Sequence, residues 1–586
     1  MIFLRKHGIA FFLSLMVGLV YASHHFFIPF LLDSRSQVYY PITFAAYYDE
    51  AILYAPRAHA AFLGQWIVGD FSLAEYPRGP SLLPILNPLV LGKFSKIMGS
   101  MRVGLMASDF LFPALIFLII YFLLWEIVSR RTPALIFSSL FIFFPKLGIY
   151  IPPVTALNFQ ELIKSFLPFL RTDEALYFTQ FEEPKITFVF MALAFYLACR
   201  AIKRNECLTT YLAGASFGIL FYTYLYDWVS YLAALVIMGI IFLFKKDYGR
   251  LKQVAIIAGI GAAISFFYWY NLWQILQTPQ HSDIFARGGG EFSHQIRFFT
   301  VWKSYLRALV LVFGLWLFWR KPERNIFIFL SSFLLAYFAV VNLQVVTGFN
   351  PQPDHWYRVQ FLPIALAVFL IILRLFDIVS GSKQTVLASL FLLYFYAAVI
   401  YSQAMHSLKY ADAYAISKDR MASYEWLNKN TPKGSVVATL SLSANRDIQL
   451  HTHNKIFLPF GFSTLAPDEE LWERFMFIAR IFAVSPADFA NLTREEMAYY
   501  LFAEKYGSHE FDSSFRGYQR KMPDSVAEEK ISEYKKYLQS PSLDIPYKVD
   551  YVYLPAEKNS WWQDPAKTVL GLQEVYRQGD IKIYQW

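Results

Sequence analysis

The chain has 586 residues, of which 56% are hydrophobic, 19% aromatic and 17% charged, and its mean hydropathy is +0.36. Soluble globular proteins place about a quarter of their residues in Asp, Glu, Lys and Arg, so a chain this poor in charge would have to hide more apolar surface than one or two domain cores can hold. The composition therefore excludes an ordinary soluble enzyme, a disordered chain and a coiled coil, and it indicates a membrane protein with many spans.

The net charge of +9 is unevenly distributed. From residue 404 onward, 22 Lys and Arg stand against 24 Asp and Glu, whereas positions 1–403 hold 31 basic and 20 acidic residues. A nucleic-acid-binding protein would concentrate its basic excess on a folded soluble face. Here the excess lies in the apolar part of the chain, where short basic clusters set the topology of a membrane protein. We expect no nucleic-acid partner.

Apolar runs long enough to cross a hydrocarbon layer need about 17–25 residues each. Eleven such runs follow one another along the chain, and the first reads as a retained signal-anchor helix rather than as a cleaved signal peptide. They lie at 9–32, 104–128, 132–150, 186–202, 208–226, 228–244, 253–277, 302–319, 325–346, 360–380 and 384–403.

Basic clusters occur at alternate turns between these runs, from Arg5-Lys6 at the start to Lys383 near the last run. If these clusters stay in the cytoplasm, all of them fall on one side with about eleven spans. We therefore expect an integral plasma-membrane protein with a cytoplasmic N-terminus. The long loops 33–103 and 151–185 and the C-terminal region then lie outside.

Two soluble parts are expected on that outer side. Loop 33–103 carries several prolines and an amphipathic stretch at 82–97, which is typical of helices that lie along a membrane surface. Residues 404–586 combine helical stretches at 419–428 and 467–538 with strand-like segments at 435–440, 550–554 and 581–584. The predicted architecture is a polytopic α-helical membrane domain, 1–403, followed by an extracytoplasmic α/β or α+β domain, 404–586.

The first outer loop opens with the carboxylates Asp49 and Glu50, followed by Arg57. A carboxylate just beyond the first span can act as a general base, or can bind a divalent cation that steadies a phosphate leaving group. From the chemistry alone, a solvated loop acid is an equally good interpretation.

Further polar residues gather in the later outer loops. A second acidic group consists of Asp173, Glu174, Glu182 and Glu183, and two such groups at one membrane face can converge on a cation or on sugar hydroxyls. Arg358 directly precedes the tenth run, where an arginine can bind a phosphate at headgroup depth or simply snorkel to the interface. The remaining candidates for binding the substrate phosphate are Arg57, Arg287, His355 and Tyr357.

The start of the first outer loop resembles that of the GT-C glycosyltransferases. The resemblance rests on Tyr48-Asp49-Glu50, Tyr54 and Arg57, then Gly64 and Asp70, a proline-rich stretch and a second span; the span layout and the segment 422–432 extend it. This superfamily includes protein O-mannosyltransferases, lipid A aminoarabinose transferases and the catalytic subunit of oligosaccharyltransferase. The Trp-Trp-Asp-x-Gly motif of the last of these has no counterpart after the final span.

The resemblance implies an enzyme that takes a sugar from a polyprenyl-phosphate-type carrier and transfers it, with inversion, to an extracytoplasmic protein or glycan. It implies that Asp49 is the catalytic carboxylate, that Arg358 binds the carrier phosphate, and that Asp49 and Glu182 hold a cation such as Mg²⁺ or Mn²⁺ if one is used. Two alternatives stay open: a transporter or lipid flippase, and a non-catalytic envelope scaffold. Transporters usually place ionisable residues near the bilayer midplane and often show inverted repeats.

Overall fold

The structure is a computed structural model of the whole chain. It describes residues 2–32, 37–41, 50–64, 69–151, 156–179, 183–290, 292–296, 302–318, 324–376, 384–506, 522–557 and 561–586. The chain forms two compact units. Unit 1 comprises Met1–Leu31, Arg102–Trp269 and Phe292–Ala413, and unit 2 comprises Leu32–Met101, Tyr270–Glu291 and Tyr414–Trp586.

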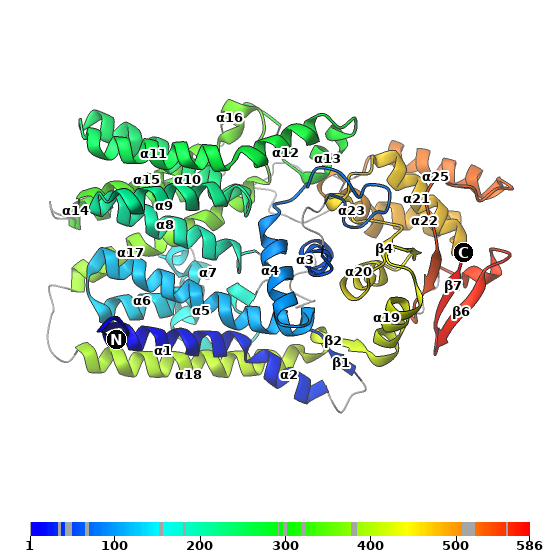
Figure 1. Cartoon of the computed structure of the whole chain (residues 1–586), viewed down its shortest axis with the longest axis horizontal. Helices are drawn as coiled ribbons and strands as arrows, with labels where there is room; N and C mark the ends of the chain where they lie inside the picture. The colour runs from blue at the N-terminus through cyan, green and yellow to red at the C-terminus, as the bar shows by residue number, and fades with distance from the viewer. Residues whose placement is uncertain are drawn as a thin grey trace. The chain divides into compact units, whose positions relative to one another are not determined.

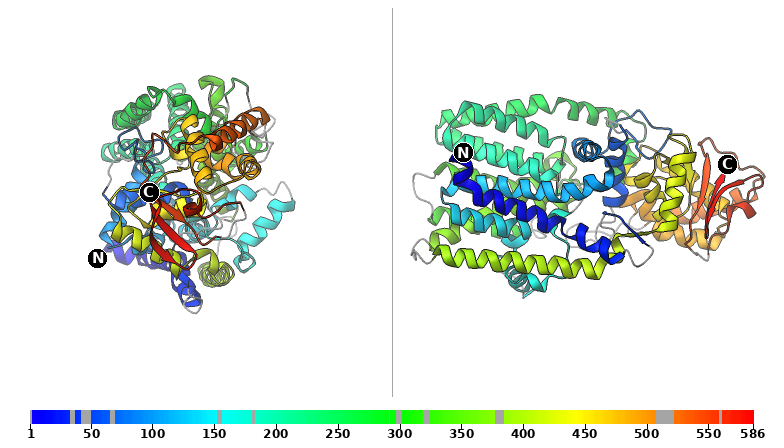
Figure 2. Two further views of the ribbon diagram at one scale, coloured as in Figure 1. Left: turned by 90° about the vertical axis from the view of Figure 1, so that its right-hand side faces the viewer. Right: turned by 60° about the horizontal axis from the view of Figure 1, so that its bottom comes forward.

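Unit 1 is built almost entirely of helices, and its long helices run side by side in Figure 1 and in the right-hand view of Figure 2. Its α-helices are α1 (Ile2–Ala22), α2 (His24–Leu32), α5 (Met101–Val128), α6 (Arg131–Phe143), α7 (Ala156–Phe166), α8 (Thr187–Arg204), α9 (Cys207–Leu220), α10 (Leu225–Phe244), α11 (Tyr248–Ile264), α12 (Phe266–Leu276, which continues into unit 2), α14 (Trp302–Phe318), α15 (Arg324–Val340), α16 (Leu343–Thr347), α17 (Phe361–Phe376) and α18 (Gln384–Tyr410). Short 3₁₀ segments join them: η3 (Pro145–Tyr150), η4 (Pro168–Leu170), η5 (Tyr177–Thr179), η7 (Pro353–Gln360) and η9 (Ala411–Tyr414).

Each of the eleven expected apolar runs contains helix, but fewer helices are long enough to cross a membrane alone. Among the described residues these are Lys6–Leu32, Met101–Val128, Leu225–Phe244, His355–Leu375 and Val386–Tyr414, with α11 and α12 as a sixth if that pair, bent by 50°, is one span. The run 132–150 is shorter in the structure because α6 ends before Pro145, which has no amide hydrogen and begins a 3₁₀ turn. The count of eleven spans stays a prediction, and so does the assignment of the loops and the C-terminal region to one side of the membrane.

Helices α5 and α8 are joined by an ion pair near each end. Asp109 of α5 pairs with Lys185, which precedes α8, at 2.5 Å. Glu126, 17 residues further along α5, accepts two hydrogen bonds of 2.8 and 2.7 Å from Arg204 at the end of α8. Because the pairs follow in the same order on both helices, the two helices run parallel, with about 25 Å between the pairs at 1.5 Å per residue.

Unit 2 contains a mixed five-stranded sheet in the order β4-β3-β5-β7-β6. Its strands are β3 (Val436–Ala438), β4 (Lys455–Ile456), β5 (Tyr551–Leu554), β6 (Gln573–Gln578) and β7 (Ile581–Gln585). Strands β4, β3 and β5 are parallel, whereas β7 is antiparallel to both β5 and β6. A separate two-stranded ribbon pairs β1 (Gln37–Tyr39) with β2 (Ala415–Ser417). The strands expected at 435–440, 550–554 and 581–584 are confirmed.

The helices of unit 2 cover this sheet and enclose an aromatic core that includes Phe457, Trp472, Phe475 and Phe477. The π-helical segment is η2 (Glu50–Tyr54), and the α-helices are α3 (Ala55–Phe62), α4 (Leu86–Ile97), α13 (His281–Gly288), α19 (Lys418–Asn430), α20 (Leu442–His451), α21 (Asp468–Ile481), α22 (Pro486–Arg494), α23 (Glu496–Phe502) and α25 (Asp524–Gln539), with 3₁₀ turns η10 (Gly461–Ser463), η11 (Ala503–Lys505) and η12 (Pro565–Lys567). The helix expected within 82–97 is present as α4, and the one expected at 419–428 is α19.

Candidate functional site

The two carboxylates expected to carry catalysis can be placed only in part. Asp49 lies outside the described residues. Glu50 is the first residue of η2, and its side chain lies outside the description. Their roles stay predictions, and so does the cation expected at Asp49 and Glu182, because Glu182 also lies outside the described residues.

Two of the three candidate phosphate-binding arginines are bonded inside unit 2. Arg57 of α3 is 2% exposed, and its Nη2 donates to the carbonyl oxygens of Leu83 at 3.1 Å and Pro84 at 2.7 Å. Arg287 of α13 is 1% exposed and donates to Asp468 Oδ1 at 2.9 Å and to the Thr464 carbonyl at 3.0 Å. Burial lowers the pKa of the Arg287 guanidinium, although the neighbouring Asp468 opposes that shift.

The second acidic group divides into an exposed pair and a buried residue. Asp173 is exposed and pairs with Lys409 at 2.5 Å, and the hydrogen bond from Lys409 lowers the pKa of its carboxyl group. Glu174 is exposed and pairs with Arg171 at 2.9 Å. Glu183, in contrast, is only 7% exposed and lies just before α8.

Arg358 lies on η7, a segment that is fixed by buried polar contacts. Trp356 is fully buried and its indole N–H donates to Asn350 Oδ1 at 2.7 Å. The Asn350 amide in turn donates to Gln344 Oε1 at 2.7 Å. This bonding holds the indole inside unit 1. The segment around Arg358 is therefore held by the fold itself.

The guanidinium of Arg358 differs from those of Arg57 and Arg287. Among the residues that the structure describes, it has no hydrogen-bond or ion-pair partner. Its charge acts at longer range on Tyr224 and Glu183. A half-buried arginine without a bonded partner, at the start of an apolar helix, is suited to bind an anion with its planar array of N–H donors.

The corner between α9 and α10 supplies the other side chains near Arg358. Tyr224 is in an extended conformation and its hydroxyl lies 3.5 Å from His355 Nδ1, while Asp227 follows in the first turn of α10. Asp227 is 8% exposed and does not cap α10; it lies within electrostatic range of Glu183. Tyr357, the remaining candidate on η7, is 38% exposed.

Unit 1 therefore brings Arg358, Glu183, Asp227, Tyr224 and His355 into one neighbourhood. It contains one cation without a bonded partner, two buried carboxylates and hydrogen-bonding rings. Such a set can bind an anionic group through Arg358 and polar hydroxyls through the carboxylates. Of the predicted site residues, Arg358, Glu183 and His355 are brought together here, whereas Arg57 and Arg287 belong to unit 2.

Sequence reasoning missed three residues of a second buried polar cluster in unit 1. Lys185, His24 and His25 surround Asp109, which is 4% exposed. Two adjacent histidines inside an apolar run were the available signal, because polar residues within spans are costly unless they have partners.

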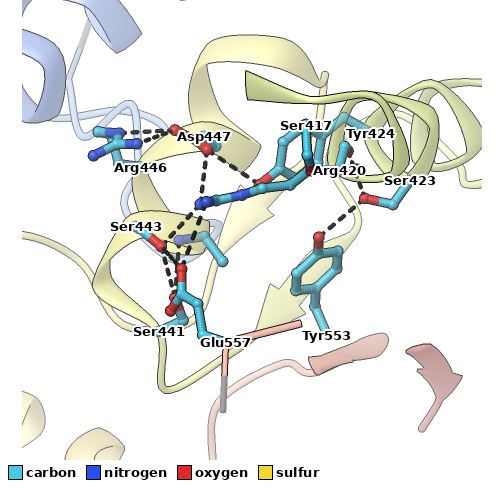
Figure 3. Close-up of polar contacts among 11 residues, drawn as sticks. Ser417, Arg420, Ser423, Tyr424, Ser441, Ser443, Arg446, Asp447, Tyr553 and Glu557 are labelled. Carbon is cyan, nitrogen blue, oxygen red and sulfur yellow. Dashed lines mark hydrogen bonds and ion pairs between the residues drawn. The ribbon is translucent and has the colours of Figure 1, made fainter. Parts of the chain in front are cut away.

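The carboxyl ends of parallel strands are a common place for ligands, and polar residues lie near the ends of β3 and β5. Figure 3 shows them bonded to one another. Arg420 pairs with Asp447 at 2.9 Å and donates to Ser443 Oγ at 2.8 Å, and Glu557 accepts from Ser441 Oγ at 2.9 Å. Burial opposes ionisation of Asp447, but Arg446 and Arg420 outweigh it and lower the pKa of the carboxyl group. The polar groups at this edge of the sheet are therefore bonded to one another within unit 2.

Comparisons with known proteins give matches among solved structures only. No family model matches the chain, and no curated protein matches it. An oligosaccharyltransferase from Archaeoglobus fulgidus, tethered to an acceptor peptide that contains an NVT sequon, has a TM-score of 0.41 and 12% identity over 94% of this chain and 70% of its own. ArnT from Cupriavidus metallidurans bound to undecaprenyl phosphate has a TM-score of 0.40 and 12% identity over 97% of both chains.

A third solved structure is AglB, the archaeal oligosaccharyltransferase from Archaeoglobus fulgidus, in complex with an inhibitory peptide and a dolichol-phosphate. Its TM-score is 0.41, with 11% identity over 94% of this chain and 69% of its own. At such TM-scores the likeness carries no argument about activity, which has to come from the residues of this chain.

Proposed function

We propose that the protein is an integral-membrane glycosyltransferase that moves a sugar from a polyprenyl-phosphate-type carrier to an extracytoplasmic protein or glycan. The observation that carries this proposal is the Arg358 guanidinium, which has no bonded partner among the described residues and lies at the start of the candidate span His355–Leu375. A carrier of this kind places its phosphate at headgroup depth and its chain in the hydrocarbon layer, which suits a cation at the end of an apolar helix.

We assign the carrier phosphate to Arg358 rather than to Arg57 or Arg287. The guanidinium groups of Arg57 and Arg287 already donate to carbonyl or carboxylate oxygens within unit 2. Displacing those bonds would leave buried acceptors without a donor, at about 1–3 kcal/mol for each one. Arg358 has no such bond to break, so its full bidentate capacity is available to a phosphate.

The chemical step needs a base near the acceptor and stabilisation of the leaving phosphate. Asp49, by its resemblance to the GT-C catalytic carboxylate, takes the proton of the acceptor hydroxyl as that oxygen attacks the anomeric carbon. The bond from that carbon to the phosphate oxygen breaks, and the phosphate leaves with the electron pair and pairs with Arg358. Attack opposite the leaving group inverts the anomeric configuration.

The carboxylates near Arg358 orient the sugar in this proposal. Glu183 is buried and near the Arg358 charge, so it is placed to accept hydrogen bonds from sugar hydroxyls next to the phosphate. A divalent cation such as Mg²⁺ or Mn²⁺, if used, would be held by Asp49 and Glu182 and would offset negative charge near the phosphate. No step above depends on it.

A transporter is the second candidate, and one observation favours it. Asp109, with Lys185 and two histidines around it, is buried inside the candidate span Met101–Val128, where transporters keep ionisable groups. A transporter should lose substrate movement when Asp109 is replaced by Asn and should have no transferase activity. A glycosyltransferase should form a covalent product.

The test is sugar transfer by the purified full chain in lipid nanodiscs. Polyprenyl-phosphate sugars and cell-envelope acceptors are incubated with the protein, and acceptors are examined by mass spectrometry for a sugar-sized gain. We expect the gain with wild type and a loss of about 100-fold or more with Asp49→Ala, which removes the base. Transfer by Asp49→Ala at the wild-type rate would contradict the proposal.

A further inference from the structure

A compact group of nitrogen and oxygen ligands lies where α1 meets α2 and α5. His24 and His25 open α2 directly after the turn at Ser23, and Asp109 belongs to α5. His24 is 5% exposed, His25 2% and Asp109 4%. One ligand atom from each of the three residues lies within 4.8 Å of the other two.

Both histidines turn Nε2 toward the same carboxylate oxygen. His25 Nε2 lies 2.9 Å and His24 Nε2 3.7 Å from Asp109 Oδ2, and the two ring centroids are 3.8 Å apart. Ligands about 2.1 Å from a tetrahedral zinc ion lie roughly 3.4 Å from one another. The two distances to Asp109 Oδ2, 2.9 Å from His25 and 3.7 Å from His24, lie on either side of that value. The distance of 3.7 Å is too long for a hydrogen bond.

The other ring nitrogen of His24 fixes which nitrogen is available as a ligand. His24 Nδ1 lies 3.0 Å from the Tyr21 carbonyl oxygen. Because a carbonyl oxygen only accepts, Nδ1 carries the hydrogen and Nε2 of the neutral ring keeps its lone pair. This lone pair lies on the side of Asp109 Oδ2. A backbone carbonyl that accepts from the second ring nitrogen is the usual outer support of a metal-bound histidine.

Lys185 occupies the other side of the carboxylate. Its ammonium donates to Asp109 Oδ1 at 2.5 Å and to Ser108 Oγ at 2.8 Å, which leaves Oδ2 on the side of the histidines. The charge of Lys185 offsets that of Asp109. Imidazole nitrogens with one carboxylate oxygen suit zinc and its neighbours better than Mg²⁺ or Ca²⁺, which prefer oxygen ligands.

Glu126, the other buried carboxylate of α5, offers a comparison. Arg204 donates to both of its oxygens at 2.8 and 2.7 Å, and this satisfies the carboxylate. Asp109 instead has a lysine on one oxygen and two imidazole nitrogens at the other. An ion pair alone would not need two histidines at Oδ2.

We propose that His24, His25 and Asp109 bind a divalent transition metal of the zinc class. The ion joins the start of α2 to α5, and solvent or another side chain completes its coordination. This site shares no residue with the Mg²⁺ or Mn²⁺ site expected at Asp49 and Glu182, and it does not depend on sugar transfer.

The test is metal binding by the untagged full chain in detergent. The protein is stripped with a chelator, titrated with ZnCl₂ or CoCl₂, and analysed by elemental mass spectrometry and by the visible absorption of Co²⁺. We expect about one ion per chain and the absorption of a four-coordinate Co²⁺ site. Wild type that binds less than about a tenth of an ion per chain would overturn the proposal.

Variants locate the ion. His24→Ala and His25→Ala should each weaken binding by about 100-fold or more, since each removes a ligand. His7→Ala is the matched control. His7 is a buried histidine of α1 whose Nδ1 forms a hydrogen bond of 2.8 Å with the Tyr121 hydroxyl. The His7→Ala variant should bind the metal as wild type does. If both ligand variants bind as wild type does, the proposal is wrong.

Lys185→Met keeps the test decisive if the histidine variants fail to fold. Removing the ammonium removes a repulsive charge next to the cation, so affinity should rise by about tenfold. A Lys185→Met chain that folds but binds more weakly than wild type would contradict a metal at Asp109 Oδ2.

Discussion

Arg287 in unit 2 and Arg358 in unit 1 are two arginines that the sequence singled out for the same task, and the structure places them in different situations. Arg287 is 1% exposed and bonded to Asp468 and Thr464. Arg358 is half-buried and has no bonded partner among the described residues. The difference indicates that Arg287 holds the fold, while Arg358 is available to a ligand. The residue type and its position in a loop do not distinguish an arginine that stabilises the fold from one that is available to a ligand.

The largest expected effect is on the stability of unit 2. Arg287→Met should lower the free energy of unfolding by about 2–4 kcal/mol, because it removes a buried guanidinium that is bonded to the partly buried Asp468. This loss of stability is smaller than the largest losses seen when one partner of a buried ion pair is removed, because Lys505 also bonds to Asp468. Hydrogen exchange of α13 and α21 in the full chain measures it. Unchanged exchange would mean that Arg287 is not structural and would remove the contrast with Arg358.

Glu183→Gln tests whether the acid near Arg358 serves the fold or the substrate. We expect transfer to fall by about 10–100-fold, since the variant loses a charged acceptor for sugar hydroxyls. The thermal midpoint should change little, because Gln keeps the size of the buried side chain and an acceptor oxygen. A large drop in the midpoint with full transfer in the remaining folded protein would assign Glu183 to the fold. Glu174→Gln, at an exposed acid in the same loop, is the control.

His451 extends the comparison to a pH-dependent group of unit 2. Burial lowers its pKa to about 4, so the unfolded chain binds the proton more tightly than the folded chain. Its contribution to stability is therefore fully present above about pH 6.5 and is lost as the pH falls toward 4, at about 1.4 kcal/mol per pH unit. Exchange of the α20 amides between pH 7 and 4 measures this loss.

The matched variant for that measurement is His451→Phe. It keeps the ring that stacks on Tyr424, with centroids 5.4 Å apart, but does not titrate. The slope assigned to His451 should disappear in this variant. An unchanged slope would assign the acid sensitivity of unit 2 to other groups, among them His59, whose pKa burial also lowers.

The smallest effect is expected at the exposed pair between Asp173 and Lys409. Solvent-exposed ion pairs contribute little, so Asp173→Asn should change transfer by less than about twofold and leave the thermal midpoint unchanged. Initial rates at saturating carrier provide the comparison. A loss of transfer close to that of Glu183→Gln would place Asp173 in the substrate site.

Local patterns predicted much of this fold. Hydropathy located a helix in every apolar run, and the strand-like segments at 435–440 and 581–584 contain β3 and β7. Hydropathy alone missed the end of α6, since it predicted one run over 132–150 across Pro145, which lacks the amide hydrogen that a helix needs. These features depend on residues that are near one another in the sequence.

The partners of buried charges were not readable. Arg287 bonds to Asp468, 181 residues away, and Lys185 bonds to Asp109, 76 residues away. A charged residue in a loop reads as solvated unless its partner is known. Arg57 and Arg287 therefore stayed candidates for phosphate binding beside Arg358, to which the resemblance assigned the carrier phosphate.

The most direct test of the account is the preference of the protein for a phosphate on the lipid chain. Polyprenyl phosphate and the polyprenol of equal length are titrated against wild type, Arg358→Ala and the control Arg171→Ala, whose arginine is bonded to Glu161 and Glu174. Native mass spectrometry gives the affinities. We predict that wild type and Arg171→Ala bind the phosphate about 10–100-fold more tightly than the alcohol, as expected for a charged hydrogen-bonded pair, and that Arg358→Ala loses this preference. An undiminished preference in Arg358→Ala would contradict the account.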